Sequence, residues 1–156
     1  MTTVERIYWD SDAFLGWFQK EDGKVDLCAG TLERAKNGEV VIFTSTLTIA
    51  EVLWKRHAPS ITLDKAMIVR KFFRHSYIRL RNVTRLVAES AQDLVWHHSV
   101  KAKDAIHVAT ALDAGVPILE TFDHELLTLS GKLGTSKLII RKPIPPIQPV
   151  LGPPLL

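Results

Sequence analysis

Four acidic residues occupy positions from which they could act on one substrate, although they lie far apart in the chain. Asp10 and Asp123 each follow an apolar, strand-like segment, Glu51 lies within two helical turns of a third such segment, and Asp104 opens a helix. Ligands of open parallel sheets bind outside the carboxyl ends of the strands. If the three strands are neighbours, the four carboxylates converge on one cleft.

Such a cluster favours a bound cation, because carboxylates at short range raise each other's pKa and oppose folding. Mg²⁺ and Mn²⁺ prefer oxygen ligands and leave coordination positions open for water and phosphate oxygens. A metal-activated water can then attack a phosphodiester in line. The acidic set therefore predicts a Mg²⁺ or Mn²⁺ site of a nuclease.

Each acid also has a simpler interpretation. Asp10 and Asp104 have the residue type of a helix N-cap, and Asp123 could cap a helix or close a turn. Glu51 is harder to explain in this way, because it stands among Ile49, Ala50, Val52 and Leu53, where a charge needs a partner. The joint occurrence of all four favours a site over four separate caps.

Strand-like and helix-like segments alternate along the chain, and the helix predicted over 105–114, which ends at Gly115, has the strongest pattern. Alternating strands and helices predict a three-layer α/β/α domain with a central, mostly parallel, twisted sheet. The strands are predicted at 4–9, 40–44, 77–83, 116–120 and 137–140, and the main helices at 63–74, 84–97 and 105–114.

The composition is that of a folded domain: 156 residues, 46% hydrophobic and 24% charged. Cys28 is the sole cysteine, so an intramolecular disulfide is excluded and a reducing, cytoplasmic setting is expected. No apolar run approaches the roughly 20 residues that span a bilayer, so no membrane association is expected. We expect one nuclease domain over 1–142 and a proline-rich, extended tail over 143–156.

Four motifs carry a family resemblance. They are Ile7-Tyr8-Trp9-Asp10-Ser11-Asp12, Thr44-Ser45 with Ala50-Glu51 beyond it, Lys103-Asp104-Ala105-Ile106-His107-Val108-Ala109-Thr110-Ala111, and Thr121-Phe122-Asp123. Together they resemble the PIN domain, and their spacing is similar to that of VapC-type toxin ribonucleases of bacterial toxin-antitoxin pairs. The resemblance covers the chain from Val4 to about Arg141.

This resemblance implies a metal-dependent endoribonuclease that acts on single-stranded RNA, with a cognate antitoxin and a homodimeric state. It implies that the catalytic and metal-binding acids are Asp10, Glu51, Asp104 and Asp123. The family often has Asn two positions after the first acid, whereas this chain has Asp12, which can cap a helix or add a fifth carboxylate. Ser11 and Thr121 are candidates for orienting carboxylates or metal-bound water, and His107 is interpreted as a packed histidine.

The charge is uneven along the chain. The net charge is only +3, but the segment from Lys55 to Lys103 holds eleven Lys and Arg against three acids. Such a run can bind a phosphate backbone or form a solvated face, and the sequence favours neither. The candidates for RNA contact are Arg70, Arg74, Arg79, Arg81 and Lys103.

Two other functions fit parts of the pattern. Asp10-x-Asp12 after an apolar strand resembles the nucleophile motif of haloacid-dehalogenase-type phosphatases, although the expected Thr two residues after Asp12 is missing. A catalytically inactive PIN-like module that binds RNA or protein is the second alternative. The presence of all four acids argues against loss of activity.

Overall fold

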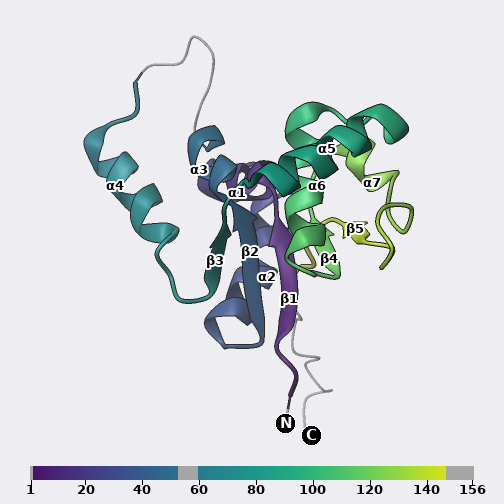
Figure 1. Ribbon diagram of the computed structural model, residues 1–156. Coiled ribbons are helices and arrows are strands. Elements are labelled where there is room, and N and C mark those ends of the chain that lie inside the picture. Colours follow the sequence, from purple (N-terminus) through teal and green to yellow (C-terminus); the bar gives the residue numbers. More distant parts are fainter. Residues whose placement is uncertain (1, 53–59, 147–156) are drawn as a thin grey trace, which may run out of the picture.

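The computed structural model describes residues 2–52 and 60–146, and within them five parallel strands form one sheet in the order β3-β2-β1-β4-β5 (Figure 1). The strands are β1 (Glu5–Trp9), β2 (Val40–Ser45), β3 (Ile78–Arg81), β4 (Ile118–Glu120) and β5 (Ile139–Arg141). The predicted α/β class and parallel sheet are confirmed. Three predicted strand ranges were too long or displaced: 77–83 shortens to Ile78–Arg81, 116–120 shortens to Ile118–Glu120, and 137–140 shifts to Ile139–Arg141.

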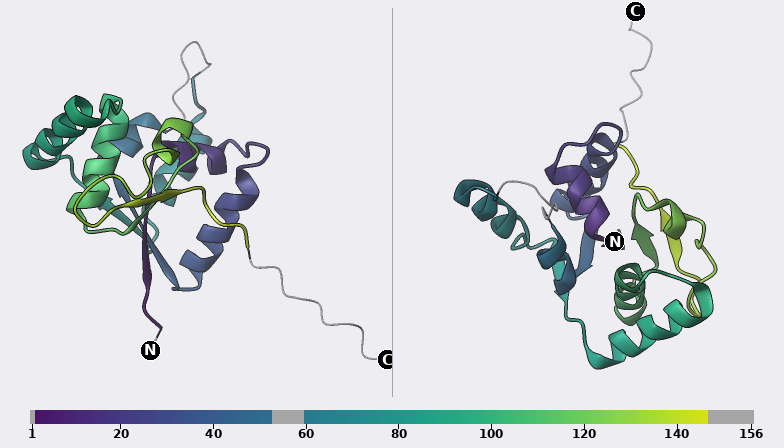
Figure 2. Two further views of the ribbon diagram at one scale, coloured as in Figure 1. Left: turned by 90° about the vertical axis from the view of Figure 1, so that its right-hand side faces the viewer. Right: turned by 90° about the horizontal axis from the view of Figure 1, so that it is seen from above.

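Helices cover both faces of this sheet (Figure 2). Alternate residues of β1 face opposite sides: Ile7 and Trp9 join the core under α1 (Ser11–Phe18) and α2 (Val25–Lys36). Tyr8 instead joins the core under α5 (Arg85–His98) and α6 (Ala102–Asp113). All three side chains are fully buried. The period of two in β1 is therefore what separates the two cores.

The topology places a switch point beside β1. The chain runs from β1 to β2 and β3 on one side, and β4 then pairs with the other side of β1, with Trp9 opposite Glu120. The carboxyl ends of β1 and β4 therefore lie side by side at one edge. This edge is where ligands of doubly wound sheets bind, and the chain leaves it through Asp10 and Thr121.

The shorter helices lie around this framework. They are α3 (Thr46–Glu51), which follows β2 directly, α4 (Leu63–Phe72), and α7 (His124–Leu127), which follows β4. Figure 1 shows α4 standing away from the layered body, and none of its residues is buried. The helix expected to open at Asp104 begins earlier, because Lys101 is its N-cap residue and Ala102 its first residue.

The start of the predicted tail lies against α2. A Cβ atom at Gly30 would collide with the backbone of Ile144 and Pro145, so glycine allows this approach. Pro143 is buried. Residues 147–156, the rest of the predicted tail, lie outside the described residues, as do 53–59. Within the described part, no helix is both long and apolar enough to cross a membrane.

Candidate active site at the carboxyl edge of the sheet

Asp10 is the most buried of the four predicted acids, with 2% of its surface exposed. It caps α1, since its Oδ1 accepts a hydrogen bond from the backbone N–H of Ala13 at 3.1 Å. The predicted cap is thus present, and it fixes the orientation of the carboxylate. Burial raises the pKa of Asp10 to about 7, even though the Thr121 hydroxyl and the nearby His107 oppose this rise.

Thr121 connects two of the acidic positions. Its hydroxyl donates to Oδ2 of Asp10 and accepts from the backbone N–H of Asp123 at 3.0 Å. Asp123 in turn caps α7, with its Oδ1 accepting from the N–H of Leu126 at 2.9 Å. One threonine hydroxyl therefore fixes the end of β1 relative to the start of α7. The predicted orienting contact of Thr121 with a carboxylate is present in the structure.

Asp104 and Asp12 lie close enough to Asp123 to feel its charge. Burial first and repulsion from Asp123 second raise the pKa of Asp104 to about 6. The same two causes, in the same order, raise the pKa of Asp12. Both residues lie in the first turns of helices, where the helix dipole favours a negative charge. Asp12 is therefore part of the acidic group, and it does not cap α1.

Glu51 is held differently from the aspartates. It is the last residue of α3, and its Oε2 lies 2.8 Å from Nε2 of His107. Nδ1 of the same histidine lies 2.7 Å from the hydroxyl of Tyr8. Although burial alone would raise it, the pKa of Glu51 is lowered by His107, by the Ser11 hydroxyl and by Lys103. The partner that the apolar surroundings of Glu51 required is His107.

The aspartates have no such cationic partner. Among residues 2–52 and 60–146, no lysine or arginine forms an ion pair with Asp10, Asp12, Asp104 or Asp123. In the same residues no three His, Cys, Asp or Glu side chains lie near enough together to hold a metal ion as they stand. The donor chemistry nevertheless suits a hard divalent cation, since every aspartate offers oxygen and their charges repel one another.

The sequence of this domain matches a known family over most of its length. The model of the PIN domain matches residues 7–132. The chain belongs to the PIN domain family. The predicted family is thereby confirmed, and all four predicted acids lie within the matched segment. No curated protein matches the chain in sequence.

Two solved structures share the PIN fold of this chain. VapC20 of Mycobacterium tuberculosis, described as a sarcin-ricin-loop-cleaving toxin, superimposes with a TM-score of 0.58 at 20% identity, over 76% of this chain and 90% of its own. A chain of FitAB bound to an IR36 DNA fragment superimposes with a TM-score of 0.55 at 14% identity, over 88% of this chain and 94% of its own. At these identities the similarity concerns the fold.

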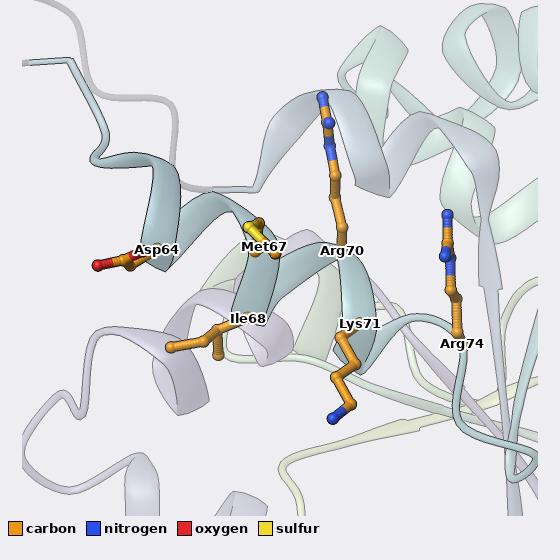
Figure 3. A pocket seen from close by; sticks show the side chains of 6 residues that line it. All are labelled: Asp64, Met67, Ile68, Arg70, Lys71 and Arg74. Carbon is orange, nitrogen blue, oxygen red and sulfur yellow. The ribbon is translucent and has the colours of Figure 1, made fainter.

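The predicted basic residues of this PIN domain lie outside the acidic group. On α4, Figure 3 shows the side chains of Arg70 and Arg74 extending in the same direction, with Lys71 pointing away from them. They line a cavity of about 710 Å³ together with Asp64, Met67 and Ile68. A smaller hollow of about 270 Å³ reaches Asp104. The cavity on α4 is therefore separate from the acidic site.

The other three basic candidates are exposed, and two of them are paired with acids. Arg79 and Arg81 both lie on β3 with exposed side chains. Arg81 forms an ion pair with Asp113 at 3.4 Å. Lys103 lies 3.9 Å from Oε1 of Glu51, with 71% of its side chain exposed. Two further residues of the basic segment, Lys55 and Arg56, lie outside the described residues.

Sequence reasoning did not assign Tyr8 to the site and left the role of Asp12 open. Tyr8 stands two residues before Asp10 on a strand, a spacing that places both on one side. His107 stands three residues after Asp104 on a helix, which likewise puts them on one face. These spacings indicated that Tyr8 and His107 lie near the acids, but they do not reveal the hydrogen-bond partner of each side chain.

Proposed function

We propose that this PIN domain is a divalent-metal-dependent endoribonuclease that hydrolyses phosphodiester bonds of single-stranded RNA, with Mg²⁺ or Mn²⁺ as its cofactor. The observation that carries the proposal is the group of aspartates at the carboxyl edge of the sheet, with the raised pKa values of Asp10 and Asp104 and no paired cation among the described residues. Acids arranged in this way are destabilised until a cation neutralises them.

The residues that would hold the cation are Asp10, Asp104 and Asp123, with Asp12 and Glu51 at the margin of the group. When bound, the ion supplies positive charge that neutralises these carboxylates, activates water and stabilises the leaving oxygen. Asp10 is aligned by the Ala13 N–H and the Thr121 hydroxyl, so one part of the site is fixed in advance. The remaining side chains must move closer together to form a three-ligand group.

In the proposed reaction, the oxygen of a water molecule forms a bond to phosphorus and the bond from phosphorus to the 3′ oxygen breaks. The water loses a proton, and the leaving 3′ oxygen gains one. The products therefore carry a 5′-phosphate and a 3′-hydroxyl. An RNA whose own 2′-hydroxyl attacked would instead leave a 2′,3′-cyclic phosphate, so end-group analysis distinguishes the two routes.

The test is cleavage of a single-stranded RNA panel with Mn²⁺, with Mg²⁺ and with chelator. We expect cleavage that requires the ion, and Asp104→Asn should reduce it at least about 100-fold, because it removes several kcal/mol of charge stabilisation. Asp26→Asn is the matched control, since Asp26 lies in the first turn of α2, as Asp104 does in α6, but is exposed and away from the site.

The outcomes of this test separate the proposal from its alternatives. Full cleavage by Asp104→Asn, or cleavage that persists in chelator, contradicts the proposed site. RNA binding in chelator without cleavage in Mn²⁺ favours the inactive binding module. Phosphatase activity with a covalent aspartyl-phosphate at Asp10 favours the dehalogenase-type alternative.

We further propose that the biological role is that of a cytoplasmic toxin, with a cognate antitoxin and a homodimeric state. Similarity in fold to VapC20, described as a toxin, supports this role. Exposed apolar residues on α4 support the presence of a protein partner, because Leu63, Met67 and Ile68 are 74%, 61% and 65% exposed. Growth arrest on expression, relieved by a protein encoded beside the gene, is the test.

A further inference from the structure

Three side chains from three different elements form a continuous hydrogen-bonded chain beside the acidic group. The hydroxyl of Tyr8 on β1 lies 2.7 Å from Nδ1 of His107 on α6, and Nε2 of His107 lies 2.8 Å from Oε2 of Glu51 on α3. Tyr8 is fully buried and His107 is 1% exposed. β1 leads to Asp10, α6 carries Asp104, and α3 ends in Glu51, so the chain joins the elements that bear three of the four predicted acids.

When the His107 ring is neutral, the chemistry of the three groups fixes the direction of the hydrogen bonds. An ionised carboxylate only accepts, so the proton on Nε2 of His107 is donated to Glu51. In the neutral ring Nδ1 then accepts, and the Tyr8 hydroxyl supplies the proton for it. Tyr8 therefore selects the ring tautomer that donates to Glu51. Both ring nitrogens are occupied by partners within the fold, which leaves neither for a ligand.

Glu51 depends on this support because its own helix gives it little. α3 has six residues, and Glu51 is the last of them, followed by a C-cap residue in extended conformation. The Glu51 side chain is 12% exposed. Its other neighbours are the Ser11 hydroxyl, which acts on its pKa less strongly than His107 does, and Lys103, which is 71% exposed and 3.9 Å away. Exposed ion pairs of this length contribute little, so His107 is the principal group that fixes the orientation of Glu51.

We propose that His107 is a positioning residue, held by Tyr8, that aims the Glu51 carboxylate toward the cation and RNA at the acidic group. This inference rests on the proposed function, because it assigns a role within the same site. His107 shares a face of α6 with Asp104, three residues earlier, so one helix places one acid directly and a second acid through its histidine.

The experiment measures Mn²⁺ affinity by calorimetry and RNA cleavage in His107→Leu, His107→Gln, Tyr8→Phe and Glu51→Gln. Loss of a group that orients a metal ligand typically lowers metal affinity about 10- to 100-fold, and we expect such a loss in His107→Leu. His107→Gln should recover much of it, because a glutamine amide N–H can donate to Glu51. His97→Leu, at an exposed histidine of α5, is the control.

A purely structural role predicts a different pattern. It would lower the melting temperature of His107→Leu and leave the Mn²⁺ affinity of the folded fraction at the wild-type value, and this outcome overturns the proposal. An equal loss in His107→Leu and His107→Gln also overturns it, since the amide keeps the donor. If His107→Leu does not fold, the comparison of His107→Gln and Tyr8→Phe with wild type decides, with Tyr8→Phe expected to show the larger loss.

A second readout separates this inference from the proposed function. Histidine ¹⁵N NMR of the metal-free protein, at a pH where the ring is neutral, should show His107 protonated on Nε2, with a shift that changes in Glu51→Gln. An Nδ1-protonated or averaging ring overturns the inference. If the ring shows the expected tautomer but wild type neither binds Mn²⁺ nor cleaves RNA, the proposed function and the positioning role built on it both fail, and the hydrogen-bonded chain is structural.

Discussion

Two buried acids, Glu120 and Asp10, lie at the same edge of the sheet but differ in how many donors and cations surround them. Glu120, on the α2 side, is fully buried and accepts from Trp9 Nε1 at 2.8 Å, from the Thr31 hydroxyl at 2.7 Å and from the Arg141 guanidinium at 3.4 Å. Asp10 is also buried, yet it has one hydroxyl and one backbone N–H as donors and no ion-paired cation among the described residues.

The difference shows which of the two buried acids has its charge compensated by other groups of the protein. Burial raises the pKa of Glu120, and its donors and the positive charge of Arg141 reduce this rise, so its charge is compensated in part inside the protein. Around Asp10 the neighbours include further acids, and Asp12 raises its pKa further. A buried acid that the fold leaves uncompensated is a candidate for binding an external cation.

The largest effect on stability should follow from removing the Glu120 carboxylate. Glu120→Ala leaves Thr31 and Trp9 without their acceptor and Arg141 with Glu5 as its remaining acidic partner. Loss of one partner of a buried pair typically reduces the free energy of unfolding by about 3–5 kcal/mol. For a chain of this size the melting temperature should fall by roughly 10 °C. Thermal unfolding measures this fall. A loss below about 1 kcal/mol would show that the Glu120 carboxylate does not stabilise the fold, and Glu120→Gln provides a milder variant if Glu120→Ala does not fold.

Adding a cation should sharpen the contrast between the two acids. Mn²⁺ at about 100 times its Kd should raise the free energy of unfolding of wild type by about 2.7 kcal/mol, because it binds only the folded state. Glu120→Gln should keep this gain, and Asp104→Asn should lose it. Melting curves with and without Mn²⁺ provide the measurement. An equal gain in all three proteins would place the ion elsewhere.

The stability of the protein should also respond to pH through Asp10. The pKa of Asp10 is raised to about 7 in the folded state, so between about pH 4 and pH 7 the folded protein holds a proton that the unfolded chain has released. The free energy of unfolding of metal-free wild type therefore falls as pH rises through this window. Asp10→Asn lacks this contribution and should be more stable than wild type at pH 8, by about 4 kcal/mol, with the gain absent near pH 4.

Denaturant titrations of both proteins across this pH range measure the effect. A difference between Asp10→Asn and wild type that does not change with pH would mean that Asp10 is compensated in the folded protein, as Glu120 is.

The smallest expected effect is on RNA binding by helix α4, which lies away from both Asp10 and Glu120. In an Asp104→Asn background, Arg70→Ala with Arg74→Ala should weaken binding of single-stranded RNA and reduce its logarithmic salt slope by about 1.4, as expected for two lost phosphate contacts. Fluorescence anisotropy at several salt concentrations tests this. Lys36→Ala with Lys132→Ala is the matched control, because both lysines are exposed. Unchanged slopes in both pairs would remove α4 from the RNA surface.

Much of the site was accessible from residue types and spacing. Asp10 and Asp123 are typical N-caps after strands, and both cap helices at the predicted edge. Asp104 was assigned to the start of its helix, but the helix begins two residues earlier, because Lys101 takes the cap position without a side-chain hydrogen bond. A boundary of this kind depends on backbone geometry that the local residue types do not specify.

Partners across the fold could not be read in the same way. The apolar neighbours of Glu51 indicated that it needed a partner, but 56 residues separate it from His107. The role of Glu120 could not be predicted from the sequence, because its hydrogen-bond donors come from β1, α2 and β5, up to 111 residues away. Hydrogen bonds between such distant residues follow from strand order and register, which no local pattern contains.

Local properties of the chain, namely strand and helix periods, caps and the motif around Asp104, were enough to predict the α/β class and the PIN family and to propose the four acids of the site. Which of the acids are compensated became visible in the folded structure. Strand order brings Arg141 to Glu120 and His107 to Glu51, while it leaves Asp10, Asp12, Asp104 and Asp123 near one another without an ion-paired cation in the described residues. Charge compensation depends on distances through space, and folding alone sets those distances.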